Sequence, residues 1–394
     1  MSDDIKIAHP KRIITLVVLM SLIVGSAVDI FVPSLPHIAT YFKTSAAFAG
    51  LSVTVYLIAY GIFQLVYGSL TDTFGRRKIV ICSLIGYIVF TYFIVFSKTI
   101  YIFLVMRFLQ GIFTAGLGVS NRAMLSDSFS GKALSKYASY ALMAWAAGPI
   151  VSPYIGGYMQ LYFGWQANFY LLTAYSVIVC IITIILLPET CQHYTPFHIR
   201  HFFSNYKLIC FNKYFMSGAL ICGLMYGFIT VYNVIGPFLI QTELGYGPTT
   251  YGEIALFLGL GWLIGILIFR YKLAKLSEHS IFPVLVISMI IALIWLIFGI
   301  IHLFNLVTTV LPAILLFVCG AISFSSSFAK ALSLFSKIGG SASAALGSIF
   351  SIIAGLSSGG ASFLEADSLL PISLTYLGLI LISMLMYRVG RLRS

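Results

Sequence analysis

Two charged residues, Asp29 and Arg107, stand inside long apolar runs of this 394-residue sequence. An unpaired charge within hydrocarbon costs several kcal/mol, so each should be neutralised or paired. Counted along a helix from the outer end of its run, Asp29 lies roughly 15 Å deep and Arg107 about 10 Å deep, so tilted helices could bring them together. A nearby cation and burial act on a carboxylate in opposite directions, and their balance can permit proton exchange. We predict a proton-coupling pair; the alternative is a static buried ion pair.

A second charged cluster lies in the segment 68–78, which reads GSLTDTFGRRK. Glycine permits a tight turn and a close helix approach, and a carboxylate can form charge-assisted hydrogen bonds with arginine. Anchoring of basic residues at a membrane surface would explain the arginines but not the acid between two glycines. The residues expected in this cluster are Gly68, Asp72, Gly75, Arg76 and Arg77.

The elements that must position these residues are membrane-spanning helices. Hydrophobic residues make up 60% of the chain and charged residues 9%, with a mean hydropathy of +1.02, whereas about a quarter of a soluble domain is charged. Apolar runs of about 20 residues, enough to cross a bilayer, recur almost end to end, without the alternation of a barrel. We predict an all-α polytopic membrane protein. Its twelve expected spans are 13–39, 47–70, 79–97, 100–125, 138–162, 167–187, 214–240, 251–270, 281–303, 306–328, 340–364 and 368–388.

The basic residues indicate how the spans are oriented. With the N-terminus inside, cytoplasmic segments hold 19 of the 23 lysines and arginines, among them Arg76, Lys132 and Arg270. The opposite loops hold only Lys43 and Lys98. This asymmetry predicts that both termini are cytoplasmic. The same asymmetry explains the net charge of +12, because basic residues gather at the cytoplasmic side of the lipid bilayer. The bilayer is therefore the expected partner, and a nucleic acid is not.

The segment 188–213 is the longest hydrophilic stretch and divides the spans six and six. We therefore expect an N-terminal six-helix bundle over 1–187, a cytoplasmic linker over 188–213 and a C-terminal six-helix bundle over 214–394. Asp29 precedes Pro33 by four residues, as Asn233 precedes Pro237. Duplicated halves around a central site are a common design of secondary transporters.

Candidate cavity residues are aromatic or amide side chains on the predicted spans, a mixture that suits amphipathic ligands. They are Tyr56, Tyr60, Gln64, Gln110, Tyr226, Asn233 and Gln241. Glu253 begins a span in the sequence Thr250-Tyr251-Gly252-Glu253, which is typical of a capping box. Contact of Glu253 with substrate or protons is the alternative.

Other chemistries find little support in the sequence. The six cysteines are scattered without metal-ligand spacing, so we expect apolar, unpaired cysteines and no metal. A phosphate-binding loop of the form GxxxxGK[ST] is absent, which argues against an ATP-driven pump. A membrane-embedded enzyme using His37, His302 and the acids is a distant alternative, and no cofactor is expected.

The segment 68–78 resembles the hallmark loop of the major facilitator superfamily: glycine, two residues, a small residue, aspartate, two residues, glycine and two arginines. The resemblance implies that Asp127, at the end of the fourth span, joins Asp72 and Arg76 in a cytoplasmic charge network that holds one gate conformation. A solvated helix end without a gating role is the alternative. Arg122, further inside the span, is either another partner or a residue that reaches toward the interface.

Two further segments resemble drug:proton antiporters of that superfamily. Residues 107–111, RFLQG, are similar to one motif, and residues 148–157, GPIVSPYIGG, are similar to a motif of exporters, with Ser152 where glycine is commoner. The motif positions are Gly148, Pro149, Pro153, Gly156 and Gly157. Residues 29–36, DIFVPSLP, and 341–347, SASAALG, resemble signatures of the bicyclomycin and chloramphenicol resistance group.

The resemblance implies two pseudo-symmetric six-helix bundles and alternating access. It further implies a monomeric, proton-coupled exporter of small amphipathic organic compounds in the bacterial inner membrane, with substrate and protons as its partners. A carrier of one metabolite, such as a siderophore or an amino-acid derivative, is the alternative on the same fold.

Overall fold

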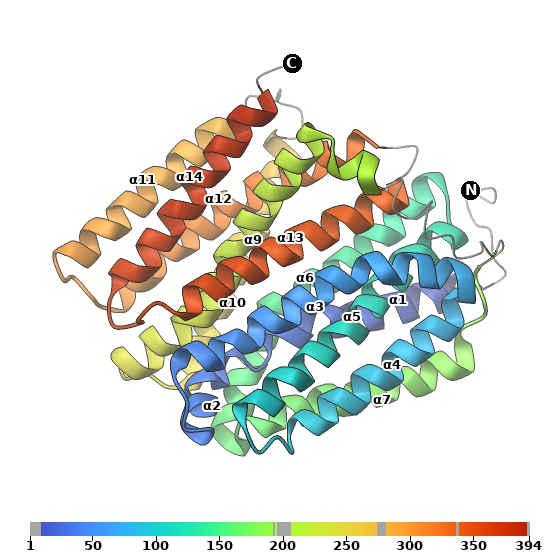
Figure 1. The fold of residues 1–394 in the computed structure, drawn as a ribbon, viewed down its shortest axis with the longest axis horizontal. Helices are drawn as coiled ribbons and strands as arrows, with labels where there is room; N and C mark the ends of the chain where they lie inside the picture. Colours follow the sequence, from blue (N-terminus) through green and yellow to red (C-terminus); the bar gives the residue numbers. More distant parts are fainter. Residues whose placement is uncertain (1–8, 192–193, 195–205, 274–280, 336–338, 392–394) are drawn as a thin grey trace.

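The computed structural model describes residues 9–191, 194, 206–273, 281–335 and 339–391, and this part of the chain is helical with no strand (Figure 1). Eleven of its helices are long and apolar enough to cross a membrane. The helix α6, with 33 residues the longest of those described, is not among the eleven. The prediction of an all-α polytopic protein is confirmed.

We call the helices before the segment 188–213 the first group. They are α1 (Pro10–Asp29), η1 (Val32–Ser34), α2 (Leu35–Tyr41), α3 (Ala46–Phe74), α4 (Arg76–Ile94), α5 (Ile100–Ser128), α6 (Gly131–Phe163) and α7 (Gln166–Leu186).

The helices after that segment form the second group. They are α9 (Lys213–Phe238), η2 (Leu239–Glu243), α10 (Pro248–Ile268), η3 (Phe269–Leu273), α11 (Ile281–Ile300), α12 (Leu306–Ser333), α13 (Gly339–Ser362) and α14 (Leu369–Arg391). In Figure 1 most of this group lies at the upper left, with α13 running beside α3. Whether each group is a separate domain with the expected boundaries stays a prediction.

Local sequence signals explain several helix starts. The side chain of Asn212 accepts hydrogen bonds from the backbone N–H groups of Tyr214 and Phe215 at the start of α9. Asn305 and Thr308 form a capping box at the start of α12, so two of the free N–H groups of that helix are satisfied. Long apolar runs then continue each helix until a glycine, a proline or a polar segment follows.

Prolines interrupt the helices at corresponding places in the two groups. The helix α1 ends at Asp29, and the short helix η1 with Pro33 and then α2 follow. In the second group Pro237 lies inside α9, just before the wider turn η2. Proline breaks a helix because it lacks an N–H and clashes with the preceding turn. The two breaks lie within one or two turns of Asp29 and Asn233, respectively.

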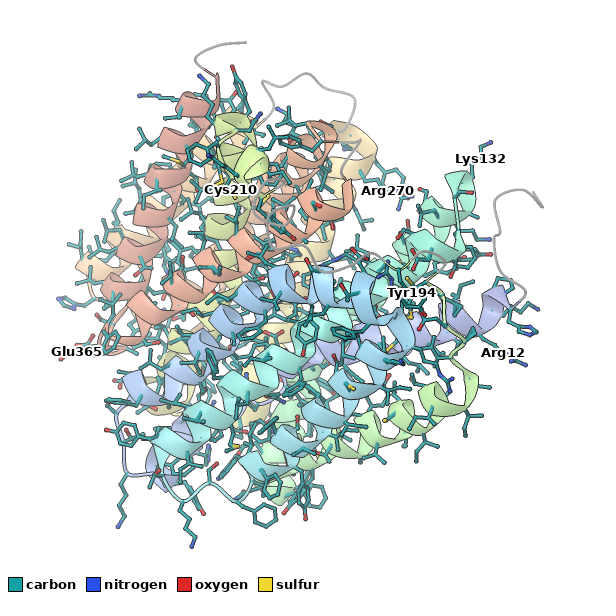
Figure 2. The ribbon with its side chains drawn as sticks, turned by 45° about the vertical axis from the view of Figure 1, so that its right-hand side comes forward. Arg12, Lys132, Tyr194, Cys210, Arg270 and Glu365 are labelled. Carbon is teal, nitrogen blue, oxygen red and sulfur yellow. The ribbon has the colours of Figure 1, made fainter. Side chains whose placement is uncertain are left out.

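The two groups are in contact at one end of the molecule and along α3 and α13. We name the end that holds the segment 68–78 the loop end, and the end that holds Glu365 the far end; Figure 2 shows Lys132 and Arg270 at the former and Glu365 at the latter. Toward the far end, Thr54 on α3 and Ser358 on α13 share a hydrogen bond of 2.9 Å. A Cβ atom at Gly157 on α6 would lie 2.5 Å from the carbonyl oxygen of Pro248 at the start of α10.

Toward the loop end, the packing of α3 against α13 differs from the packing of α6 against α10. A Cβ atom at Gly347 on α13 would still lie 2.6 Å from the side chain of Gln64 on α3. On α6, contact with α10 reaches Ile150, which lies against Gly259, and none of residues 131–147 is buried. The helix groups are therefore closed at the far end, while the first half of α6 stands open toward the loop end.

Candidate functional site

Asp29 and Asn233 join the two helix groups inside the molecule. The amide nitrogen Nδ2 of Asn233 donates a hydrogen bond of 2.6 Å to Oδ1 of Asp29. The two residues are only 2% and 6% exposed. The other carboxylate oxygen, Oδ2, is buried and has no partner among the described residues. Among the described residues, the carboxyl group of Asp29 therefore has one hydrogen-bond partner, the neutral amide of Asn233 from the opposite group.

Arg107 lies fully buried between two aromatic rings. Its guanidinium carbon is 4.4 Å from the ring centre of Phe31 and 4.5 Å from that of Tyr56, so both rings stabilise the cation through their π faces. Nη1 donates to the carbonyl oxygen of Ala27 at 3.0 Å and to the side chain of Gln110.

The static ion pair between Asp29 and Arg107, the alternative to a proton-coupling pair, is not formed: both ion pairs of the described residues belong to Arg76. The two side chains do not meet in this geometry, and their role in proton coupling stays a prediction. Arg107 donates to backbone oxygens, and the rings of Phe31 and Tyr56 enclose its planar group. Gln110, expected in the cavity, instead bonds Arg107 and donates to Thr91 at 2.8 Å.

A small aromatic cavity lies between the two groups. Three predicted residues line it: Tyr56, Tyr60 and Tyr226. The remaining lining residues are Val24, Gly25, Val28, Leu57, Trp145, Phe350 and Ser351. Its volume of about 20 Å³ leaves room for about one water molecule. A larger ligand therefore requires these side chains or the helix groups to move apart.

The other amide residues predicted to line the cavity, Gln64, Asn233 and Gln241, are not among its lining residues. Asn233 bonds Asp29, as described above. Gln64 is fully buried and accepts a hydrogen bond of 2.9 Å from Arg122. Gln241 donates to the carbonyl oxygen of Pro33 at 2.8 Å, which is a further hydrogen bond between the groups.

The charged residues of the segment 68–78 and Asp127 form a compact network at the loop end. Nη1 of Arg76 donates to Asp72 at 2.6 Å, and Nε of Arg76 donates to Asp127 at 2.9 Å. Arg77 points elsewhere and donates to the carbonyl oxygen of Ile184 at 3.0 Å. One arginine thus connects the end of α3, the start of α4 and the end of α5.

Glu189 belongs to this network and was missed from the sequence. Its carboxylate accepts the backbone N–H groups of Arg76 at 2.9 Å and Arg77 at 3.2 Å, the first N–H groups of α4, where a negative charge is favourable. Gly75, with φ of +89°, turns the chain so that these groups face Glu189. An acid directly after Pro188 at the end of a predicted span was the available signal.

The glycines of the segment 148–157 lie where helix backbones touch. A Cβ atom at Gly156 would lie 1.7 Å from the carbonyl oxygen of Ile30, and one at Gly148 would lie 2.2 Å from the backbone of Gly25. Pro149 and Pro153 stand inside α6, and the carbonyl oxygen of Pro153 faces Gly252 on α10. These positions let α6 touch α1 within its group and α10 across the groups. Gly68, by contrast, has a nearest neighbour 3.6 Å from its Cβ position, the hydroxyl oxygen of Tyr206.

The predicted capping box at Thr250 and Glu253 is wrong. The helix α10 begins at Pro248 with Gly247 as its N-cap and has no side-chain cap, because proline fits the first helical position and moves the start upstream. Glu253 instead lies beside Tyr158 of α6, whose hydroxyl is 3.5 Å away.

Some predictions concern residues outside the described part, including Lys6, Arg200, Lys275, Lys337, Arg393 and most of the linker. Within the described residues no group of three or more His, Cys, Asp or Glu side chains is placed to hold a metal ion.

A family model described as Major Facilitator Superfamily matches residues 17–362. The chain is 30% identical over 270 residues to an uncharacterized MFS-type transporter, YdgK, of Bacillus subtilis, covering 67% of each chain. It is 26% identical over 328 residues to multidrug resistance protein MdtL of Shewanella oneidensis, covering 82% of this chain and 81% of MdtL. With a bicyclomycin resistance protein homolog of Haemophilus influenzae it shares 26% identity over 55% of this chain and 56% of that relative.

Solved structures with the same fold are more distant in sequence. A D-xylose–proton symporter superposes with a TM-score of 0.77 at 14% identity, covering 96% of this chain and 97% of the symporter. The human organic anion transporter MFSD10 superposes with a TM-score of 0.66 at 16% identity, covering 96% and 99%. At these identities the likeness concerns the fold.

Proposed function

The chain belongs to the major facilitator superfamily and is a multi-pass membrane transporter, and we propose that it exports small amphipathic organic compounds in exchange for protons. The observation that carries this proposal is the hydrogen bond of 2.6 Å between Asp29 and Asn233. It places a buried ionisable group at the contact of two helix groups that must separate on one side of the site in alternating access.

Protonation of Asp29 changes the strength of that bond. An ionised carboxylate accepts a charge-assisted hydrogen bond from Asn233, and a protonated one accepts only a neutral bond, about half as strong. Proton binding and separation of the groups at this point therefore favour each other. A cycle follows in which Asp29 takes a proton while the far end is open and releases it while the far end is closed.

Arg107 has a supporting part in this proposal. Its charge is held beside Phe31 and Tyr56 without an ion pair to Asp29. It donates to the carbonyl oxygen of Ala27, two residues before Asp29, at 3.0 Å. A fixed cation at this place favours the ionised carboxylate without neutralising it completely, so release of the proton stays feasible.

The distribution of basic residues supports a cytoplasmic loop end and a bacterial inner-membrane location. With that orientation, the groups are in contact on the outer side, and residues 131–147 of α6, none of which is buried, lie toward the cytoplasmic side. Substrate would then enter from the cytoplasm. The network of Arg76, Asp72 and Asp127 would stabilise this arrangement from the loop end.

The substrate class is supported by the cavity and by the relatives. An aromatic cavity with tyrosine hydroxyl groups suits amphipathic compounds of varied shape. Two relatives carry the names multidrug resistance protein and bicyclomycin resistance protein homolog. The membrane-enzyme alternative is set aside, because the family and its relatives are transporters.

Everted membrane vesicles with a pH-sensitive dye test the proposal. Vesicles energised by respiration should lose part of their proton gradient when chloramphenicol, bicyclomycin or another amphipathic compound is added. Asp29→Asn should abolish this response, and Asp367→Asn, at an exposed acid of the far end, should retain it. A wild-type response that persists in Asp29→Asn would contradict the proposed proton site. Transport of one metabolite alone would favour a dedicated carrier.

A further inference from the structure

Arg122 is a basic residue whose position the proton site does not explain. It lies on α5, six residues before the helix ends at Ser128, which is about 9 Å along the axis. Its neighbours Asn121, Met124 and Leu125 are buried, whereas Arg122 is exposed. Among the described residues its charge has no carboxylate partner, because both ion pairs belong to Arg76.

The partner of Arg122 lies at the seam between the helix groups. Nη2 of Arg122 donates to Oε1 of Gln64 at 2.9 Å, and Gln64 packs against Gly347 of α13. The amide nitrogen Nε2 of Gln64 is buried and has no partner among the described residues. A buried amide donor without a partner is costly, so a ligand that accepts a hydrogen bond there would be stabilised.

This pair of donors lies beside the aromatic cavity. The hydroxyl oxygen of Tyr60 would be 2.8 Å from a Cβ atom at Gly118, one turn of α5 from Arg122, and Tyr60 also lines the cavity. Arg122, Gln64 and Tyr60 therefore follow one another from the loop end toward the cavity. Together they offer hydrogen-bond donors and a positive charge.

Among the described residues, no carboxylate that is free of another partner lies beside this pair of donors to balance the charge. The cavity wall contains neither an acid nor an amine, and Asp29 beyond it is already bound by Asn233. At the loop end, Asp72 and Asp127 are held by Arg76, and Glu189 is held by backbone N–H groups. The basic residues Lys132, Lys136, Arg270 and Lys272 stand on α6 and η3 at that end. A field of one sign at an entrance attracts ions of the opposite sign.

From this arrangement we propose that Arg122, Gln64 and Tyr60 bind the carboxylate end of an amphipathic aromatic substrate, and that the transporter prefers aromatic monoanions to lipophilic cations. The proposal rests on the proposed export function. The aromatic part of the substrate occupies the cavity among Tyr56, Trp145 and Tyr226, and its carboxylate accepts hydrogen bonds from Arg122 and Gln64. A cationic compound would meet Arg122, which has no carboxylate partner among the described residues.

Uptake into everted vesicles of three fluorescent compounds tests the preference: one aromatic carboxylate, its neutral methyl ester, and a cationic amine on the same ring system. Wild-type protein should take up the carboxylate at least about tenfold faster than the amine, the scale of one hydrogen bond to a charged group. Arg122→Gln should lower the carboxylate-to-ester ratio by about tenfold. Arg122→Lys should keep most of this ratio, and Lys98→Gln, a matched loss of charge in the opposite loop, should not change it.

Equal or faster uptake of the amine by the wild-type protein would overturn the inference. It would also be overturned if Arg122→Gln and Lys98→Gln gave the same carboxylate-to-ester ratio. Proton-coupled uptake of the amine alone would refute the substrate class and leave the proposed function standing. Failure of all three compounds and of the drug panel to move protons would instead refute the proposed function.

Discussion

At the residue scale, the site rests on an acid in the first group and an amide at the corresponding place in the second. Asn233 was expected to shape the substrate cavity, but it binds Asp29 instead. An amide can donate to the carboxylate in either of its protonation states. In the proposed proton exchange Asn233 therefore acts as a positioning residue, and its effect should be visible in coupling.

Asn233→Leu removes this donor while keeping a side chain of similar size. We expect proton-coupled uptake to fall about tenfold or more, because loss of one hydrogen bond to a charged buried group costs about 1.5–3 kcal/mol. The measurement is substrate-driven proton movement in everted vesicles. Thr54→Val is the matched control, since it removes a neutral hydrogen bond between the same helix groups. Equal coupling in Asn233→Leu and the wild type would show that the contact is incidental.

At the element scale, the packing of the helix α6 depends on glycines whose backbone directly contacts the backbone of neighbouring helices. Its glycines at 148 and 156 touch the backbone of α1, and Gly157 touches the start of α10. Close approach of backbones through small residues is the usual means of packing membrane helices, where the hydrophobic effect contributes little. The same helix borders the seam that must open, so its packing governs both stability and movement.

Gly156→Ala should destabilise the protein. The added Cβ would lie 1.7 Å from the carbonyl oxygen of Ile30, and a backbone atom can move only if α1 and α6 separate. We expect a loss of about 1–3 kcal/mol, typical of overpacking, seen as a lower thermal transition temperature in detergent. Gly360→Ala, where nothing lies within 4 Å, should leave this temperature unchanged. Indistinguishable transitions would contradict the packing described for α6.

The sequence predicted the helices well and the side-chain contacts less well. The predicted span 47–70 became α3 (Ala46–Phe74), and 306–328 became α12 (Leu306–Ser333), because an apolar run is a local property. The contact of Asp29 with Arg107 that tilted helices could have allowed is not formed, since depth along a helix does not fix which way a side chain points. Arg76, Asp72 and Asp127 do lie together, and the family motif located them. Glu189 and Asn233 act through partners more than 100 residues away, which one sequence does not reveal.

At the scale of the whole molecule, the two helix groups meet at the far end and along α3 and α13, while residues 131–147 of α6 are not buried. In the proposed alternating-access cycle this asymmetry corresponds to the state in which the far end is closed. The cavity of about 20 Å³ is too small for a drug-sized ligand, which needs several hundred Å³. Loading of substrate must therefore widen the space around Tyr56 and Tyr226.

A pair of cysteines at the far end should detect the closed state. Thr54→Cys with Ser358→Cys, in a background without the six native cysteines, should form a disulfide on mild oxidation, because the two hydroxyl oxygens are 2.9 Å apart and a disulfide needs closely spaced Cβ atoms. Transport should stop on oxidation and return on reduction. Lys132→Cys with Arg270→Cys at the loop end is the control and should not cross-link without substrate. The reverse pattern would mean that the resting protein is closed at the loop end.

Proton release by the purified protein in weakly buffered solution, measured when a transported compound binds, shows whether Asp29 carries the exchanged proton. We expect release of about one proton per chain from the wild type, because a single carboxylate, Asp29, gives up its proton in the proposed exchange. Asp29→Asn should bind the compound, as measured by quenching of tryptophan fluorescence, and release none. Equal proton release from the wild type and Asp29→Asn would contradict the central claim that Asp29 carries the exchanged proton.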